Sequence, residues 1–182
     1  MVSIAAGLRL DDISRWLGNY TKLVRTMPNT TALISAGITG QYADPSVDLE
    51  GRTTAEKILR AVGSTVWIEN EEKMDAVTAI SGSGPAYVFY FLEAMESAAL
   101  NLGFDAGSAR QLAVETFIGA ARLAEQSSES ISTLRERVTS KGGTTEAALM
   151  SFASSGIAGA IEHGILAAQT RGRELGDLLG KD

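Results

Sequence analysis

Strand-like and helix-like patterns occupy separate parts of this chain, and that separation limits which folds it can adopt. Every strand-like run lies before about residue 70, and the remainder has the periodicity of helix. The apolar patterns predict strands at 2–6, 22–27, 38–42 and 65–69, and helices at 10–17 and 49–62. Strands that alternate with helices at this spacing indicate a parallel-type α/β layer, and roughly 70 residues make up only half of a doubly wound domain.

Three long helical patterns dominate the rest of the chain. They cover Pro85–Leu102, Ser108–Glu125 and Gly156–Leu179, with Asp105 as the expected cap of the second. The stretch 86–92 is apolar almost all round, so its helix should be buried centrally or within an oligomer. The predicted fold class is therefore a partial α/β layer followed by an all-α region.

Charge and composition exclude several functional classes. The chain has 182 residues with a formal net charge of −6, and the whole excess of acid lies after residue 70. This balance argues against a nucleic-acid binder. Zero cysteines exclude a thiolate nucleophile, and a single histidine excludes a multi-histidine metal site. No apolar run reaches membrane-spanning length and the start lacks a signal-peptide pattern, so we expect a cytoplasmic protein with no membrane partner.

The segment Ser81–Ala86 contains a glycine pattern that resembles the start of a dinucleotide fingerprint. It reads Ser-Gly-Ser-Gly-Pro-Ala, but the third glycine position is Tyr87 and a helix-like stretch precedes it. A dinucleotide fingerprint requires a strand before the glycines, so that interpretation fails. A tight turn that lets another group approach the backbone, or a plain helix–helix corner, both fit.

The segment Val138–Thr145 has the composition of an anion site. Paired glycines and hydroxyl residues precede the helical run 146–153. Free backbone N–H groups at the positive end of a helix suit a carboxylate or a phosphate. An ordinary loop with a threonine cap fits the same residues.

Two further features carry weaker information. The segment Arg25–Thr30 stands at the end of a predicted strand, where α/β sheets bind ligands, although a proline-fixed loop explains it equally well. His163 stands among apolar positions in mid-helix and is interpreted as a packed or solvent-edge residue.

Taken in order, these motifs resemble the pyrroline-5-carboxylate reductase family over essentially the whole chain. The resemblance rests on Ile4–Gly7, Arg25–Thr30, Met74–Phe89 and Val138–Thr145. It covers the later portion of the family, without the N-terminal part that holds the glycine fingerprint and the ribose contacts. The chain also has Lys141 where the family commonly has proline, which places a cation beside the expected carboxylate site and removes rigidity from the loop.

The resemblance implies a domain division and a reaction. Residues 1–69 would form the C-terminal half of a Rossmann-type dinucleotide-binding domain, and 70–182 a helical dimerisation and substrate-binding domain that forms a homodimer or higher oligomer. The implied reaction reduces 1-pyrroline-5-carboxylate to L-proline by hydride transfer from NADPH or NADH. The reacting carbons must then lie about 3–3.5 Å apart.

The resemblance also implies roles for individual residues. Thr78 would supply a hydroxyl near the imine nitrogen, and Glu71 would lie on the other side of the substrate. The remaining assignments are the substrate carboxylate to Ser140, Gly142, Gly143, Thr144 and Thr145, and the cofactor to Ile4, Ala5, Ala6, Met27, Pro28, Asn29 and Arg137, with no metal.

Two alternatives to the reductase remain open. One is a non-catalytic helical dimerisation module derived from the same family. The other is a hydroxy-acid or 6-phosphogluconate type of dehydrogenase, which typically uses a lysine in the corresponding helix. The segment Met74–Phe89 contains no lysine, which argues against that second alternative.

We predict that the 182-residue chain by itself binds nicotinamide cofactor weakly or not at all. The chain contains no Gly-x-Gly-x-x-Gly in strand–helix context, so the pyrophosphate lacks a helix N-terminus. A fluorescence titration with NADPH measures the affinity. A dissociation constant in the micromolar range or below would contradict the prediction.

Overall fold

The computed structural model describes residues 1–181 and divides into two compact units. The first unit comprises residues 1–86 and 163–182, and the second comprises residues 87–162. The division falls inside two long helices, α4 (Gly84–Asn101) and α8 (Ile157–Leu179), which each contribute to both units. The predicted domain boundary between residues 69 and 70 stays a prediction.

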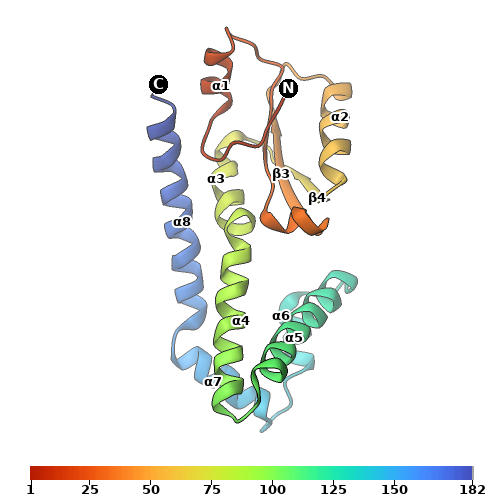
Figure 1. Ribbon diagram of the computed structural model, residues 1–182, viewed down its shortest axis with the longest axis vertical. Helices are drawn as coiled ribbons and strands as arrows, with labels where there is room; N and C mark the ends of the chain where they lie inside the picture. Colours follow the sequence, from red (N-terminus) through yellow and green to blue (C-terminus); the bar gives the residue numbers. More distant parts are fainter. Residues whose placement is uncertain (182) are drawn as a thin grey trace. The chain divides into compact units, whose positions relative to one another are not determined.

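The first unit is built on a four-stranded mixed sheet in the order β1-β2-β3-β4. Figure 1 shows α2 along one side of this sheet and α1 on the other. The bounds are β1 (Val2–Ser3), α1 (Leu10–Trp16), β2 (Val24–Met27), η1 (Thr30–Ile34), β3 (Gly37–Ala43), α2 (Leu49–Arg60), β4 (Gly63–Trp67), η2 (Glu71–Lys73), α3 (Met74–Val77) and the π-helix η3 (Thr78–Gly82).

The sheet is not uniformly parallel, which corrects the expectation from strand–helix alternation. β1 pairs with β2 in parallel, and β3 with β4 in parallel, but β2 and β3 are antiparallel. Each parallel pair has a crossover helix, α1 or α2, between its strands. Only the short η1 separates β2 from β3, and a connection without a crossover permits antiparallel pairing alone.

Apolar side chains fill both faces of the sheet. Leu10 and Ile13 of α1 pack with Leu23 in one cluster. The other cluster joins Val24 and Ala43 of the sheet to Val47, just before α2, and to Ala55 of α2. Each helix therefore buries one apolar stripe against a strand pair, as the sequence pattern predicts.

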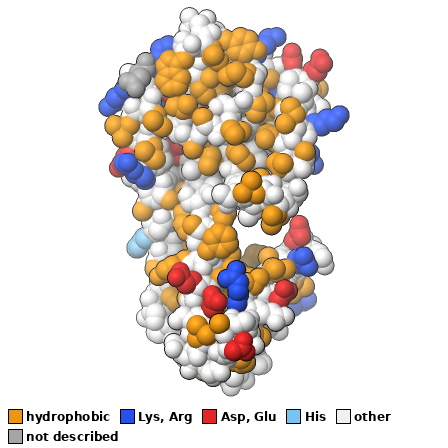
Figure 2. Space-filling model, viewed as in Figure 1, with side chains coloured by type: hydrophobic (Ala, Val, Ile, Leu, Met, Phe, Trp, Pro, Cys, Tyr) orange, Lys and Arg blue, Asp and Glu red, His pale blue; other side chains and the backbone are white. Residues whose placement is uncertain are grey.

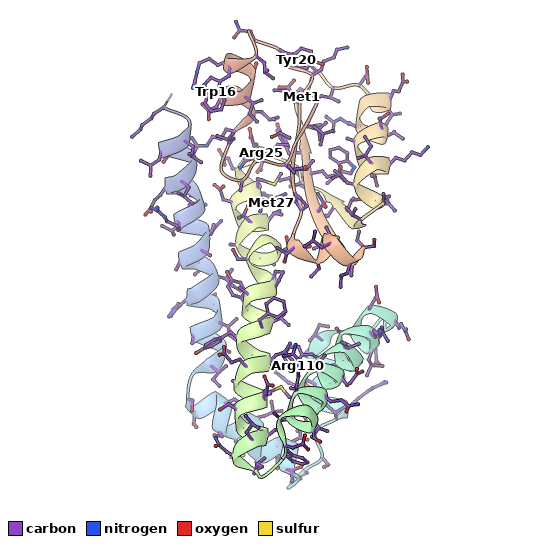
Figure 3. The ribbon with its side chains drawn as sticks, in the orientation of Figure 1. Met1, Trp16, Tyr20, Arg25, Met27 and Arg110 are labelled. Atoms are coloured by element: carbon purple, nitrogen blue, oxygen red, sulfur yellow. The ribbon has the colours of Figure 1, made fainter. Side chains whose placement is uncertain are left out.

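A buried ion pair joins three segments of this unit that are distant in sequence. Arg25 of β2 has a side chain that is only 4% exposed, and its Nη1 donates to Glu71 Oε1 over 2.8 Å. The same carboxylate oxygen accepts the backbone N–H of Leu10, at the start of α1, also over 2.8 Å. Figure 3 shows Arg25 between the sheet and the beginning of α3.

The end of α8 attaches to α1 through arginines. Arg9 Nη2 lies 2.6 Å from Asp177 Oδ1, and this hydrogen bond raises the pKa of Arg9. Arg15 Nη2 donates to the carbonyl of Gly180 over 2.7 Å, at the carboxyl end of the helix. A cation there also complements the negative end of the helix dipole.

The second unit is entirely helical in its regular structure. Asp105 accepts the N–H of Ser108 over 3.0 Å, as the predicted cap requires, and Ser130 accepts that of Thr133 over 3.1 Å. The helix that follows Ser130 was not among the predicted ones. Besides its parts of α4 and α8, the unit contains α5 (Ala106–Gln126), α6 (Ile131–Arg137) and α7 (Thr144–Ser154).

This unit buries little of its own apolar surface. Within residues 87–162 the structure buries only Ala109 and Ala113. The apolar helix segment 86–92 is not covered by the chain itself, since Phe89 is 63% exposed and Tyr90 is 74% exposed. In the described part of the chain, no helix is long and apolar enough to cross a membrane.

We predict that Glu71→Ala destabilises the first unit by about 3 kcal/mol. The substitution leaves the buried Arg25 guanidinium without its close partner, and loss of one member of a buried pair costs about 3–5 kcal/mol. Urea unfolding followed by circular dichroism measures the change. Arg171→Ala, which breaks an exposed pair with Glu174, serves as the control and should leave the midpoint nearly unchanged. Equal shifts for the two variants would contradict the prediction.

Candidate functional site

Six of the seven predicted cofactor residues, all except Arg137, lie at one edge of the sheet in the first unit. β1 and β2 are parallel neighbours with Ser3 opposite Arg25, so residues 4–6 and 27–29 leave the sheet side by side. The Thr26 hydroxyl donates to the Ser3 carbonyl over 2.9 Å and ties the two strand ends together. This edge holds the carboxyl ends of β1 and β2, and ligands bind at the carboxyl ends of strands in α/β sheets. The Ile4 side chain is 65% exposed there.

The π-helix η3 packs directly onto the same strand end. A Cβ added at Gly82 would lie 2.9 Å from Met27 Cε, and one added at Gly40 would lie 2.5 Å from Val77 Cγ1. Gly40 therefore lets α3 approach β3 at a distance that a side chain there would not permit, whereas Gly82 lies against the flexible end of the Met27 side chain. Figure 3 shows Met27 on the strand facing this helix. The Ser81–Ala86 segment thus includes the close backbone approach that the glycine pattern indicates.

Thr78 is the first residue of the π-helix and its hydroxyl proton is already engaged. Thr78 Oγ1 donates to the Met74 carbonyl over 2.9 Å. The Ser83 N–H bonds five residues back to the Thr78 carbonyl over 2.8 Å, which defines the widened turn. The hydroxyl oxygen retains lone pairs, so Thr78 can accept a hydrogen bond from a ligand.

Glu71 is held mainly by the protein itself. One of its oxygens accepts from both Arg25 and the Leu10 N–H. The residue also borders a cavity of about 560 Å³, in which every lining residue is charged. The lining residues are Arg9, Arg25, Glu71, Glu72, Asp75, Arg173 and Asp177.

The loop 140–145 of the second unit has the geometry of a tight turn before a helix. The Gly143 N–H bonds to the Ser140 carbonyl over 3.0 Å, and Gly142, at the third turn position, has φ +72°. A type II turn needs such a residue there and favours proline just before it, at position 141. A Cβ at Gly143 would lie 2.5 Å from Ser140 Oγ and 3.0 Å from the Ser140 carbonyl oxygen, so the turn packs tightly at this position.

Thr144 and Thr145 are the first two residues of α7, whose N-cap is Gly143. N–H groups in the first turn of a helix have no intrahelical acceptor and point toward solvent or a ligand. The first turn of α7 therefore presents backbone donors, and the binding of an anion there stays a prediction.

Glu146 belongs to this loop although sequence reasoning did not select it. Its Oε2 accepts the Gly142 N–H over 2.6 Å. The signal was present in the sequence, because a glutamate three residues after the helix cap is typical of a capping box. One loop donor therefore already binds a carboxylate of the chain itself.

Arg137 ends α6 and pairs with Glu129 over 2.5 Å. It lies in the second unit, with the loop, whereas the other predicted cofactor residues lie in the first. Thr78 and Glu71 lie with that first group, close to the β2 end. Within residues 1–181, no cluster of three or more acidic or histidine side chains could hold a metal ion.

The architecture defines a class: the later part of a Rossmann-type layer joined to a helical dimerisation region. The family of pyrroline-5-carboxylate reductase dimerisation matches residues 71–175. The chain therefore belongs to the pyrroline-5-carboxylate reductase family.

Known relatives are similar to this chain, in sequence or in structure, over nearly its whole length. It is 43% identical over 181 residues to pyrroline-5-carboxylate reductase of Pseudomonas aeruginosa, and spans 66% of that protein's length. The structure of the Coxiella burnetii reductase superposes with a TM-score of 0.92 at 40% identity, over 96% of this chain and 64% of the other. The Plasmodium falciparum reductase, solved with NADP bound, gives 0.88 at 27% identity, over 96% of this chain and 70% of the other.

Proposed function

We propose that the protein reduces 1-pyrroline-5-carboxylate to L-proline with a hydride from NADPH or NADH. The observation that carries the proposal is the loop 140–145, a glycine turn that leads into the first turn of α7, in a chain of this reductase family. The loop supplies what the chemistry needs at the substrate carboxylate, since an anchored carboxylate determines which face of the imine is attacked.

The sheet edge of the first unit fits the nicotinamide end of the cofactor. Residues 4–6 and 27–29 form an edge with exposed Ile4 and half-buried Met27 and Pro28, an apolar surface that suits a flat ring. When bound, the cofactor supplies the hydride. Arg137, in the other unit, stays a proposed cofactor contact.

Thr78 acts as an acceptor toward the substrate nitrogen. Because its hydroxyl proton goes to the Met74 carbonyl, the oxygen is free to receive an N–H. The ring nitrogen would then bind as the protonated iminium, the form whose carbon accepts hydride more readily. Glu71 lies seven residues before Thr78, and we place its carboxylate on the opposite side of the ring, where it would favour the cationic nitrogen.

The apolar surface of the second unit supports assembly into a homodimer or a higher oligomer. Its helices expose large apolar side chains, and a groove of about 530 Å³ runs between α6, α7 and the start of α8, with Met150 and Phe152 among its lining. Figure 2 shows that hydrophobic side chains also cover much of one face of the sheet-bearing unit. Exposed apolar patches of this extent mark interaction surfaces.

A non-catalytic dimerisation module is the second candidate. It is favoured by one observation, that the matched family is the dimerisation part of the reductase. Reductase activity discriminates between the two candidates. The assay uses the 182-residue chain and, in parallel, the same chain fused to the segment of the Pseudomonas aeruginosa relative that lies outside the match.

We predict that the 182-residue chain sediments as a dimer or larger species at low micromolar concentration. Phe152→Glu places a charge in the apolar groove and should shift the distribution toward monomer, because a buried charge is strongly disfavoured. Thr54→Glu, on the exposed surface of α2, adds the same charge and should have no effect. A stable, folded wild-type monomer would contradict the assembly.

We predict that Thr145→Ala lowers kcat/KM for pyrroline-5-carboxylate about 10- to 150-fold. The substitution removes one charge-assisted hydrogen bond from the loop to the substrate carboxylate, and such a bond contributes about 1.5–3 kcal/mol. Thr116→Ala, which removes an exposed hydroxyl on α5, is the matched control. If Thr145→Ala leaves kcat/KM within twofold of wild type and only lowers the melting temperature, the loop is a helix cap and the anion site is wrong.

A further inference from the structure

The amide of Asn29 joins the end of β2 to the π-helix that carries Thr78. Asn29 Nδ2 donates to the Ser81 carbonyl over 3.1 Å. We propose that Asn29 is a positioning residue, which acts on the reaction through Thr78. The proposal rests on the proposed function and revises the role assigned to Asn29 as a direct cofactor contact.

The Ser81 carbonyl needs a partner from outside its own helix. In a continuing α-helix it would accept the N–H of residue 85, and in a continuing π-helix that of Ala86, which instead donates to the Ser83 carbonyl over 3.0 Å. Residue 85 is proline, which has no N–H. The sequence therefore leaves this carbonyl without its normal donor at the junction of η3 and α4. The Asn29 side chain supplies that donor from a different element of the sheet.

The hydrogen bonds that the Asn29 amide oxygen accepts determine the orientation of the amide group. Asn29 Oδ1 accepts the Thr31 hydroxyl over 2.7 Å and the Ile38 N–H over 3.1 Å. Both partners are donors in these contacts, so the oxygen must face them and the NH₂ group must face Ser81. The amide thus connects β2, β3 and the π-helix in one arrangement.

Packing makes the position of Thr78 sensitive to this connection. Thr78 and Ser81 lie in the same five-residue π-helix, which rests on Met27 at Gly82. A short helix without its Ser81 contact can shift along the strand end, and the Thr78 oxygen would shift with it. Because a small displacement of a reacting group costs a large part of the rate, loss of the Asn29 donor should lower kcat.

A double-mutant cycle between Asn29 and Thr78 tests the proposal in whichever of the two assayed forms is active. Asn29→Asp keeps the acceptor for Thr31 and Ile38 but cannot donate to Ser81. We expect it to lower kcat about tenfold, the equivalent of about 1.4 kcal/mol, with a smaller change in KM. In the Thr78→Ala background the same substitution should cost less than twofold, since the group that Asn29 positions is gone.

Two further variants separate positioning from general damage. Asn70→Asp makes the same amide-to-carboxylate change at an exposed helix cap. Because aspartate caps a helix as well as asparagine does, this variant should leave kcat unchanged. Pro85→Ala returns an N–H four residues after Ser81 and should recover part of the kcat lost in Asn29→Asp. Amide exchange at Ser83, measured on the 182-residue chain, should speed up in Asn29→Asp and slow again when Pro85→Ala is added.

The outcomes are distinguishable. Additive losses in the cycle, or unchanged exchange at Ser83 in Asn29→Asp, would overturn the positioning role while leaving the reductase intact. If Thr78→Ala itself keeps full kcat, the role proposed for Thr78 fails, and the positioning role fails with it. Coupled losses with recovery by Pro85→Ala support both.

Discussion

The Arg25–Glu71 ion pair is the interaction on which the arrangement of the first unit depends. Desolvating a guanidinium is expensive, so a buried arginine side chain that is 4% exposed needs a carboxylate close by to offset that cost. Glu71 Oε1 does so and also receives the first N–H of α1. One oxygen atom therefore sets the relation between the second strand, the first helix and the segment that leads to Thr78.

The second unit differs from the first in that its helices do not enclose a hydrophobic core of their own. Two alanines are its only buried residues in the described chain, while phenylalanine, tyrosine and leucine side chains remain in contact with solvent. Helices hydrophobic on most sides need further partners. The family model that matches residues 71–175 describes pyrroline-5-carboxylate reductase dimerisation, and the exposed apolar surface is consistent with that match.

The glycines and the proline of the Ser81–Ala86 segment have structural roles that differ from nucleotide binding. The Ser81–Ala86 segment looks like part of a nucleotide fingerprint, but its Gly82 lies against the Met27 side chain. Its proline leaves the Ser81 carbonyl for Asn29 to bind. Neither consequence is visible from local sequence, since Asn29 is 52 residues away and meets Ser81 only after the sheet has formed.

Local patterns alone determined the types of the main strands and helices other than α6, most helix ends, and the change from mixed strand and helix to helix near residue 70. Apolar periodicity and capping residues such as Asp105 act over a few positions, and the chain carries that information directly. The resemblance to a family supplied the candidate residues. Tertiary structure decided the rest: the antiparallel β2–β3 pair, the two hydrogen bonds at Glu71 Oε1, and the bond from Glu146 to the loop. These depend on which strands pair and which groups meet across the fold, and such contacts are set by packing and chain connectivity, not by the order of neighbouring residues.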